Sequence, residues 1–277
     1  MLIITFIVGF LMGIANLIPG VSGGTMALIG GIYDRLISSI NAMTALKINR
    51  ETIFFLLKLL TGIVIAIFGF SPLMNHAVEN IPGYTYGCFI GLVAGSVPFV
   101  LGRRTRGKKR NYLFIVLGIV LVVFLAFSAN NPEQLNESNE LSHSVGLLIY
   151  DGLAGFVGAA SMILPGLSGA FVLLIMNEYV RILNALSSMD YSILFATGIG
   201  ILLGIIFISR LLKNLLKKYP SETFSFLAGL MIGAIPDLAI RAGVYPEVAF
   251  NVFIGAVVGL IISFLLSRAG KTNRSKI

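Results

Sequence analysis

Long apolar runs separated by short polar or basic segments follow one another along the whole chain. Six of the runs predict membrane-spanning helices, because about 20 apolar residues in a helix cross a bilayer core; they are residues 52–70, 84–101, 112–128, 191–209, 223–240 and 248–266. The apolar positions are continuous rather than alternating, which excludes a transmembrane barrel. The pattern predicts an all-α polytopic membrane protein.

Two further apolar elements, residues 2–40 and 145–186, are each interrupted by a Pro-Gly pair, Pro19-Gly20 and Pro165-Gly166. Proline removes a helical hydrogen bond, so each element predicts two arms. An arm of about 17 residues spans only ~25 Å, which is short for a core of about 30 Å. We therefore expect two re-entrant hairpins, with two fully spanning arms as the alternative.

The two halves of the chain repeat each other. The segment Pro19-Gly20-Val21-Ser22-Gly23 recurs 146 residues later as Pro165-Gly166-Leu167-Ser168-Gly169, and the same spacing relates Gly9 to Gly155, Tyr33 to Tyr179 and Arg35 to Arg181. A second block recurs after 138 residues and relates Gly62 to Gly200, Pro82 to Pro220, Gly91 to Gly229, Gly95 to Gly233, Pro98 to Pro236 and Arg103 to Arg241. We predict a tandem duplication with repeats at 1–128 and 145–268, a polar external linker at 129–144 and a basic cytoplasmic tail at 269–277.

Composition and charge then orient the repeats. Hydrophobic residues make up 57% of the chain, charged residues 12%, and the net charge is +8. Most basic residues lie in clusters beside the apolar runs, at 47–50, 103–110, 210–218 and 268–276. Such clusters mark cytoplasmic loops, so the charge is a topology signal and not a nucleic-acid surface.

Cluster 103–110 follows the third apolar element of the first repeat, whereas cluster 210–218 follows the second element of the second repeat. The loops at 75–80 and 243–247 are then external. The expected fold is two inverted-topology repeats, each a Pro-Gly-broken re-entrant hairpin plus three transmembrane helices, with both termini cytoplasmic. Inverted repeats with broken helices are typical of secondary transporters.

The first hairpin tip, residues 16–25, has the sequence Asn-Leu-Ile-Pro-Gly-Val-Ser-Gly-Gly-Thr. Ser22 is placed to cap the second arm, and Gly23 and Gly24 would leave its first N–H groups uncovered. A helix N-terminus of this kind favours phosphate, with Asn16 and Thr25 as further polar groups. Ser168 and Gly169 repeat the arrangement in a less polar setting. The alternative is tight helix packing without a ligand.

Arg35 and Arg181 each lie 13 residues beyond the tip serine of their hairpin. In a continuous arm this is roughly 20 Å, which would bring each arginine to one face of the membrane as a bidentate phosphate ligand. Snorkelling, or a salt bridge from Arg181 to Glu178, is the structural alternative. Acidic residues in or near the spans are candidates for proton or sodium coupling, although each could be structural; they are Asp34, Asp151, Glu178 and Asp237.

The sequence lacks the catalytic residues that the enzyme classes we considered require. Both tips match the Gly-x-Ser-Gly of intramembrane serine proteases, but the two histidines, His76 and His143, fall in predicted external loops. There is no Walker A sequence, no acidic cluster with two-metal spacing and only one cysteine, Cys88. We therefore expect a secondary transporter without cofactor or metal, and not an enzyme.

Several of these segments resemble one bacterial membrane family. They are Met12-Gly13-Ile14-Ala15-Asn16-Leu17-Ile18-Pro19-Gly20-Val21-Ser22-Gly23-Gly24-Thr25, Gly31-Ile32-Tyr33-Asp34-Arg35-Leu36, Pro165-Gly166-Leu167-Ser168-Gly169 and Glu178-Tyr179-Val180-Arg181. The family was long catalogued as a domain of unknown function and is now associated with undecaprenyl-phosphate translocation (PopT). The resemblance implies a plasma-membrane flippase that returns undecaprenyl phosphate from the outer to the cytoplasmic leaflet for envelope-polymer synthesis.

On this hypothesis the headgroup is captured near Arg181 outside, passes the tips at Ser168 and Ser22, and is released near Arg35 inside. The partners are then undecaprenyl phosphate and membrane lipids. One rival is an ion-coupled transporter of a small soluble anion that uses the same tips. Another is a membrane scaffold whose helix breaks serve only packing.

Overall fold

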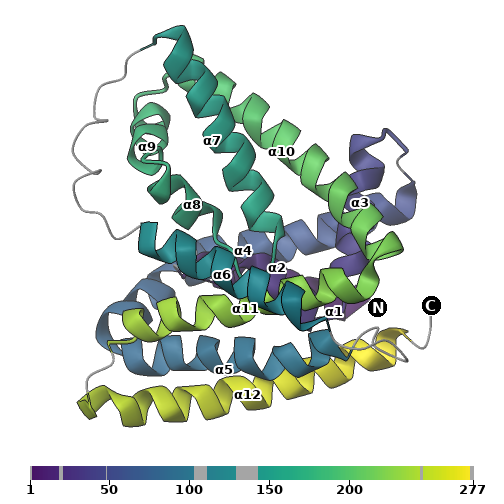
Figure 1. Ribbon diagram of the computed structural model, residues 1–277, viewed down its shortest axis with the longest axis vertical. Coiled ribbons are helices and arrows are strands. Elements are labelled where there is room, and N and C mark those ends of the chain that lie inside the picture. Colours follow the sequence, from purple (N-terminus) through teal and green to yellow (C-terminus); the bar gives the residue numbers. More distant parts are fainter. Residues whose placement is uncertain are drawn as a thin grey trace.

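The computed structural model describes residues 2–18, 21–47, 49–102, 111–128, 143–243 and 246–274. Within these ranges the chain forms helices, and the same order of short and long helices occurs twice (Figure 1). The first six are α1 (Leu2–Asn16), α2 (Gly23–Ile29), α3 (Tyr33–Thr44), α4 (Arg50–Asn80), α5 (Pro82–Leu101) and α6 (Tyr112–Ser128). The next six are α7 (Val145–Ile163), α8 (Gly169–Ile175), α9 (Tyr179–Ser187), α10 (Tyr191–Lys218), α11 (Pro220–Arg241) and α12 (Pro246–Arg274).

Six of the described helices are long and apolar enough to cross a membrane: α4, α5, α7, α10, α11 and α12. This set differs from the predicted one at two helices. The predicted span 112–128 forms α6 with only 17 residues. The first arm of the second hairpin, α7, has 19 residues and a length of about 28 Å, so it is longer than expected. Together with apolar side chains exposed on α4 and α12, these helices make the chain a multi-pass α-helical membrane protein.

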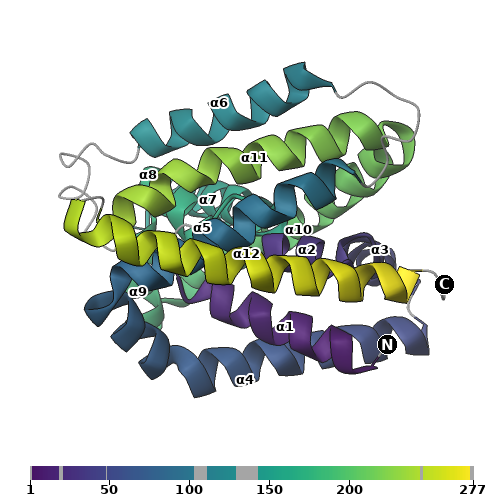
Figure 2. The same ribbon diagram turned by 90° about the horizontal axis from the view of Figure 1, so that it is seen from below.

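Glycines bring the long helices together in pairs. α1 packs on α4 and α7 on α10, while α5 packs on α12 and α6 on α11 (Figures 1 and 2). A Cβ on Gly62 would lie 2.5 Å from the Phe6 carbonyl oxygen, and one on Gly200 would lie 2.7 Å from the Gly152 carbonyl carbon. Small residues of this kind let membrane helices approach closely. Positions that match between the two halves in sequence therefore make matching contacts.

Two helices continue through segments where we expected loops. α4 runs past Pro72 to Asn80, so the expected loop at 75–80 is wrong. Proline removes only one hydrogen bond, and the Asn80 side chain donates to the His76 carbonyl at 2.9 Å to close the last turn. The basic cluster 210–218 is the end of α10, because Leu212 and Leu216, one turn apart, are buried against the protein.

The second arm of each hairpin is broken after seven residues. α2 ends at Ile29 and is followed by Gly31, which has a φ of 76°; α8 ends at Ile175 and is followed by Asn177, with a φ of 59°. In both, the next residue donates its N–H five residues back, from Ile32 to Ala27 and from Glu178 to Leu173, as in a Schellman motif. α8 and α9 are bent by 105°. The expectation that both arginines lie on a straight second arm is therefore wrong.

The short helix α2 lies at the centre of the molecule. All seven of its residues are buried, and the hydrophobic core continues from it into α1, α5 and α11. α8, its counterpart, packs against α7 and α6. The start of α1 and the end of α12 lie at the same end of the molecule (Figures 1 and 2). The linker 129–142 and Pro19-Gly20 fall outside the described residues, so predictions about their conformation stay predictions.

Candidate functional site

The two hairpin tips contact each other directly. The Ser22 hydroxyl donates to the Leu164 carbonyl at 3.1 Å, and the Tyr33 hydroxyl donates to the Ile163 carbonyl at 3.1 Å. In the opposite direction the Gly166 N–H donates to the Thr25 hydroxyl at 3.0 Å. These bonds join chain segments more than 120 residues apart, so the two hairpins are in direct contact at their tips. We call this contact the tip junction.

We expected the first N–H groups of α2 to be bare, but each of them donates to a protein acceptor. The Gly23 N–H donates to the Asn16 side-chain oxygen at 3.1 Å, and the Gly24 N–H donates to the Ser22 hydroxyl at 3.2 Å. The Thr25 N–H donates to the Ser22 carbonyl at 3.0 Å. All three N–H groups are therefore hydrogen-bonded to protein acceptors, and a phosphate at this tip would have to displace those acceptors.

Close packing accounts for the tip glycines. A Cβ on Gly24 would lie 2.8 Å from the Ile163 carbonyl oxygen, and one on Gly169 would lie 2.7 Å from a carbonyl oxygen of α7. Gly166 has a φ of 85° and lies against the backbone of α11, where a Cβ would come within 2.6 Å of a carbonyl carbon. These contacts favour the packing interpretation of the glycines over the anion-site interpretation.

The second tip is the less polar one, as its sequence indicates. Ser168 precedes α8 but makes no side-chain capping bond, unlike Ser22. It lines a cavity of about 10 Å³ together with Gly166, Phe171 and Asp237, which is room for roughly one water molecule. Asp237 accepts a hydrogen bond from Arg241 one turn later, at 2.9 Å. The structure thus brings the coupling candidate Asp237 to the second tip.

Arg181 is buried, and its guanidinium lies beside two carboxylates. Its Nε and Nη2 donate to Asp151 Oδ1 and Oδ2 at 2.8 Å and 3.1 Å. Glu178 Oε2 lies 3.8 Å from the Arg181 Nε. The three residues are 2%, 0% and 4% exposed respectively. The salt-bridge alternative is therefore what the structure shows, with Asp151 of α7 as the main partner and Glu178 as the weaker one.

Arg35 has different surroundings. It lies in the first turn of α3, partly buried, with its guanidinium carbon 4.7 Å from the centre of the Phe55 ring on α4. Its neighbour Asp34 is also partly buried. By the spacing of 146, the first repeat has Thr5 and Ile32 where the second has Asp151 and Glu178. The two arginines match in sequence, but only Arg181 has this pair of carboxylates.

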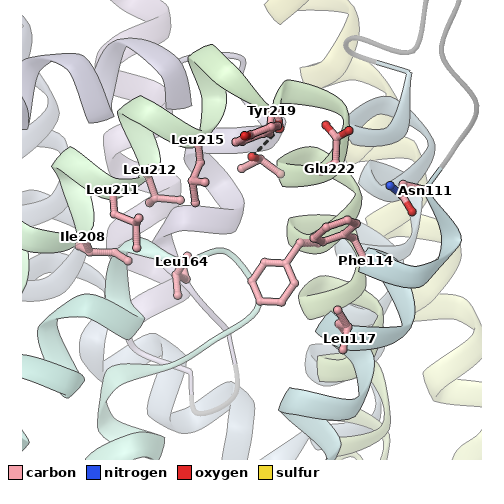
Figure 3. A pocket seen from close by; sticks show the side chains of 12 residues that line it. Asn111, Phe114, Leu117, Leu164, Ile208, Leu211, Leu212, Leu215, Tyr219 and Glu222 are labelled. Atoms are coloured by element: carbon pink, nitrogen blue, oxygen red, sulfur yellow. Dashed lines mark hydrogen bonds between the residues drawn. The ribbon is translucent and has the colours of Figure 1, made fainter.

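Two apolar grooves flank the tip junction. Groove A, about 630 Å³, lies between α6, α10 and α11 and reaches Leu164. In Figure 3 the polar side chains of Tyr219, Glu222 and Asn111 lie along its upper rim, and leucines of α10 form one wall. Groove B consists of two adjoining cavities of about 420 Å³ and 470 Å³ that share the lining residues Ile40, Met43, Leu56, Met162 and Ile163.

Groove B reaches the chain neighbours of both arginines, although neither arginine lines it. One of its cavities is lined by Leu36, which follows Arg35, and the other by Ile182, which follows Arg181. Ile163 lines groove B and its neighbour Leu164 lines groove A. Two of the three hydrogen bonds of the tip junction end on the carbonyls of these two residues, so the junction lies where the two grooves approach each other.

Three features of this site escaped prediction from the sequence. Asp151 was considered only as a coupling group and not as the partner of Arg181. Tyr33 was noted only as a repeat match, although its buried hydroxyl binds the second hairpin. Asn177 adopts, in the turn after α8, the left-handed conformation that Gly31 adopts after α2. The Gly30-Gly31 pair was a usable signal for the first break, since glycine favours this conformation.

The two histidines lie away from the tip serines. His76 is on α4 beside Asn80, and His143 is bound to Asp190 at 2.6 Å before α10. Burial raises the pKa of Asp190, but the hydrogen bond from His143 and the N–H groups of Ile193 and Ser192 outweigh it and hold this pKa below its usual range. In the described part of the chain, no group of three or more His, Cys, Asp or Glu side chains could hold a metal ion.

Comparison with known proteins connects this architecture to one family. Residues 12–246 match the family described as undecaprenyl phosphate translocase-like. A protein of Staphylococcus aureus named polyprenyl-phosphate transporter is 30% identical over 98% of this chain and 98% of its own length. A Vibrio cholerae protein with the same name is 31% identical over 84% of this chain and 76% of its own length. No solved structure matches significantly. The chain therefore belongs to the undecaprenyl phosphate translocase-like family.

Proposed function

We propose that this protein transports undecaprenyl phosphate from the outer to the cytoplasmic leaflet of the bacterial plasma membrane, which recycles the carrier for envelope-polymer synthesis. The similarity to proteins named polyprenyl-phosphate transporters, over 98% and 84% of this chain, supports the substrate class. The observation that carries the proposal is groove B, an apolar path between the neighbours of Arg181 and Arg35. An isoprenoid tail is apolar along its length and suits such a lining.

In this proposal the two arginines bind the phosphate headgroup. The N–H groups of Gly23 and Gly24 already have acceptors, whereas an arginine binds phosphate in two parallel hydrogen bonds. Arg181 receives the headgroup on the outer side and Arg35 releases it on the inner side. Between them the headgroup passes the tip junction at Ser168 and Ser22, and the tail stays in lipid or in groove B.

Two oppositely oriented repeats would give the protein a similar route from each face. The basic clusters at 103–110 and 210–218 support this orientation, since they follow different elements of the two repeats. Glu178, Asp34 and Asp237 are the proposed coupling groups, for protons or sodium. The protein would then act as a secondary transporter, without ATP hydrolysis and without a bound cofactor.

Transport of a small soluble anion is the rival function, and the apolar grooves do not favour it. Proteoliposomes loaded with labelled undecaprenyl phosphate are challenged with excess inorganic phosphate or with a short water-soluble prenyl phosphate. We expect neither to slow lipid transfer appreciably, and no protein-dependent uptake of labelled inorganic phosphate. Uptake of inorganic phosphate that the lipid fails to inhibit would overturn the proposal in favour of the rival.

A further inference from the structure

Three ionisable side chains are sealed together between α7 and the start of α9. Arg181 is held by Asp151 through two hydrogen bonds of 2.8 Å and 3.1 Å. Glu178 lies at 3.8 Å from the same guanidinium, and its Oε2 accepts no hydrogen bond from any described residue. At most 4% of each residue is exposed. The cluster is thus one tight ion pair with a second, loosely held carboxylate.

The charges in this cluster do not balance when both carboxylates are ionised. One guanidinium faces two carboxylates, which would leave a net charge of −1 in a buried site. An uncompensated buried charge is costly, and such a group becomes neutral instead. Since Asp151 already neutralises Arg181 through a bidentate contact, Glu178 is the group that keeps a proton in this conformation.

The surrounding elements provide no second cation close to the cluster within the described residues. α8 carries no charged side chain, and the basic residues of α10 begin at Arg210, about 30 Å along that helix from Asp190. The other titratable groups on the packed elements are tyrosines and one acid–histidine pair. They are Tyr150 on α7, whose hydroxyl donates to the Met176 carbonyl, Tyr179 on α9, Tyr191 at the start of α10, and Asp190 with its partner His143 before α10.

Groove B is lined by neighbours of this cluster, although not by the three charged side chains themselves. Gly155, one turn after Asp151 on α7, and Ile182, next to Arg181, both line it. Thr197 of α10 lines it as well; this side chain is 4% exposed, and its hydroxyl makes no hydrogen bond to the described residues. A polyprenyl tail in groove B would therefore place its phosphate end close to the cluster.

We propose that the substrate phosphate binds Arg181 by displacing Asp151, and that the exchange transfers one proton from solution to the Asp151 carboxylate. The proposal rests on the transport function proposed above. Once phosphate pairs with Arg181, Asp151 is a fully buried carboxylate without a cation, so it takes up a proton. When the lipid leaves, Asp151 returns to Arg181 and the proton is released. Asp151 is then a positioning residue that couples lipid movement to proton movement.

The proton count of lipid binding tests this exchange. Purified full-length protein in nanodiscs is titrated with undecaprenyl phosphate by calorimetry in buffers of different ionisation heat. Both proteins carry Glu178→Gln, so that Glu178 cannot replace Asp151 as the counter-ion of Arg181; one is otherwise wild type and the other also carries Asp151→Asn. We expect the protein that keeps Asp151 to take up about one more proton per lipid than the one with Asp151→Asn. The phosphomonoester also titrates near neutrality, but equally in both proteins, so the difference isolates Asp151.

Affinity gives a second readout. Because binding takes up a proton, wild-type affinity should fall as pH rises, and Asp151→Asn should depend less on pH. At pH 8 the variant should bind roughly tenfold tighter or more, since it has lost the competing carboxylate. Asp190→Asn is the matched control, because this carboxylate lies near Arg181 without bonding to it; it should leave the proton count unchanged.

Equal proton counts with and without Asp151→Asn, in folded proteins that carry Glu178→Gln, would overturn the exchange. Should Asp151→Asn fail to fold, the wild type alone decides with a polyprenyl phosphodiester, whose headgroup does not titrate near neutrality. An affinity for this lipid that does not change with pH would then overturn the proposed exchange. Failure of the transport function looks different: the wild type would neither bind undecaprenyl phosphate nor move it between leaflets.

Discussion

Ser22 binds the two hairpins together through both functions of its hydroxyl group. It donates to the Leu164 carbonyl and accepts the Gly24 N–H at the start of α2. Replacement by alanine leaves a buried carbonyl and a buried N–H without these partners. We expect Ser22→Ala to lower the free energy of unfolding by about 1–2 kcal/mol, measured by denaturation in detergent.

Ser168→Ala is the matched control for Ser22→Ala. Ser168 has the same place in the second hairpin but makes no capping bond, so its loss should cost less than about 0.5 kcal/mol. Equal effects of the two substitutions would show that the tip junction does not depend on the Ser22 hydroxyl.

Asp190, which lies outside the membrane spans, should make the stability of the folded protein depend on pH. Its lowered pKa means that its interactions stabilise the folded state above the unfolded pKa of about 3.9. This contribution is lost as the pH falls through the lower, folded-state pKa. Unfolding measured from pH 6 downwards should therefore show a smaller acid-induced loss in Asp190→Asn than in wild type. Parallel curves for the two proteins would contradict the role of the His143 hydrogen bond.

The residues of the candidate site could be found from the sequence, but not their partners. The repeat pointed to Ser22, Ser168, Arg35 and Arg181. It did not show that Ser22 bonds to a carbonyl 142 residues away, or that Asn16 covers the Gly23 N–H. Both depend on how the hairpins pack, and a single sequence holds no signal for such a contact. The expectation of bare N–H groups therefore failed.

At the scale of elements, glycines decide how closely the helices approach. Gly200 and Gly198 lie on the same helix, α10, two residues apart. A Cβ on Gly200 would meet the backbone of Gly152 on α7, whereas one on Gly198 would meet nothing within 4 Å. We expect Gly200→Ala to destabilise the protein by about 1–3 kcal/mol because α7 and α10 must separate. Denaturation in detergent measures the effect.

Gly198→Ala serves as its control and should be neutral or stabilising by up to about 1 kcal/mol, since alanine favours the helix. A Gly198→Ala variant as unstable as Gly200→Ala would mean that helix flexibility, not close packing, explains the glycines of α10.

The apolar runs predicted the long helices, but the predicted ends of several helices were wrong where basic residues or a proline follow the run. Basic residues at 210–218 looked like a loop because they are polar, yet Leu212 and Leu216 bury one face of that segment. The predicted span ended at residue 70, but α4 continues through Pro72, which removes only one hydrogen bond. The break after α8 had no clear signal, since Asn177 adopts the left-handed conformation less readily than glycine.

At the scale of the whole molecule, the orientation of the two repeats is the prediction with the clearest test. Glu79 at the end of α4 should face outwards and Lys218 at the end of α10 should face the cytoplasm; both side chains are exposed. In a Cys88→Ser background, an impermeant thiol reagent should label Glu79→Cys in intact cells and Lys218→Cys only after permeabilisation. Labelling of both from outside would contradict the inverted arrangement.

The central claim is that this protein carries undecaprenyl phosphate across the bilayer, and a leaflet-accessibility assay tests it most directly. Purified protein is reconstituted into liposomes that hold the lipid in both leaflets, and an impermeant phosphatase is added outside. Without transfer, hydrolysis stops when the outer half is consumed. We predict that it continues to completion in proteoliposomes, and that the double variant Arg35→Gln/Arg181→Gln stops at the protein-free level. Hydrolysis that stops at half with the wild-type protein would contradict the account.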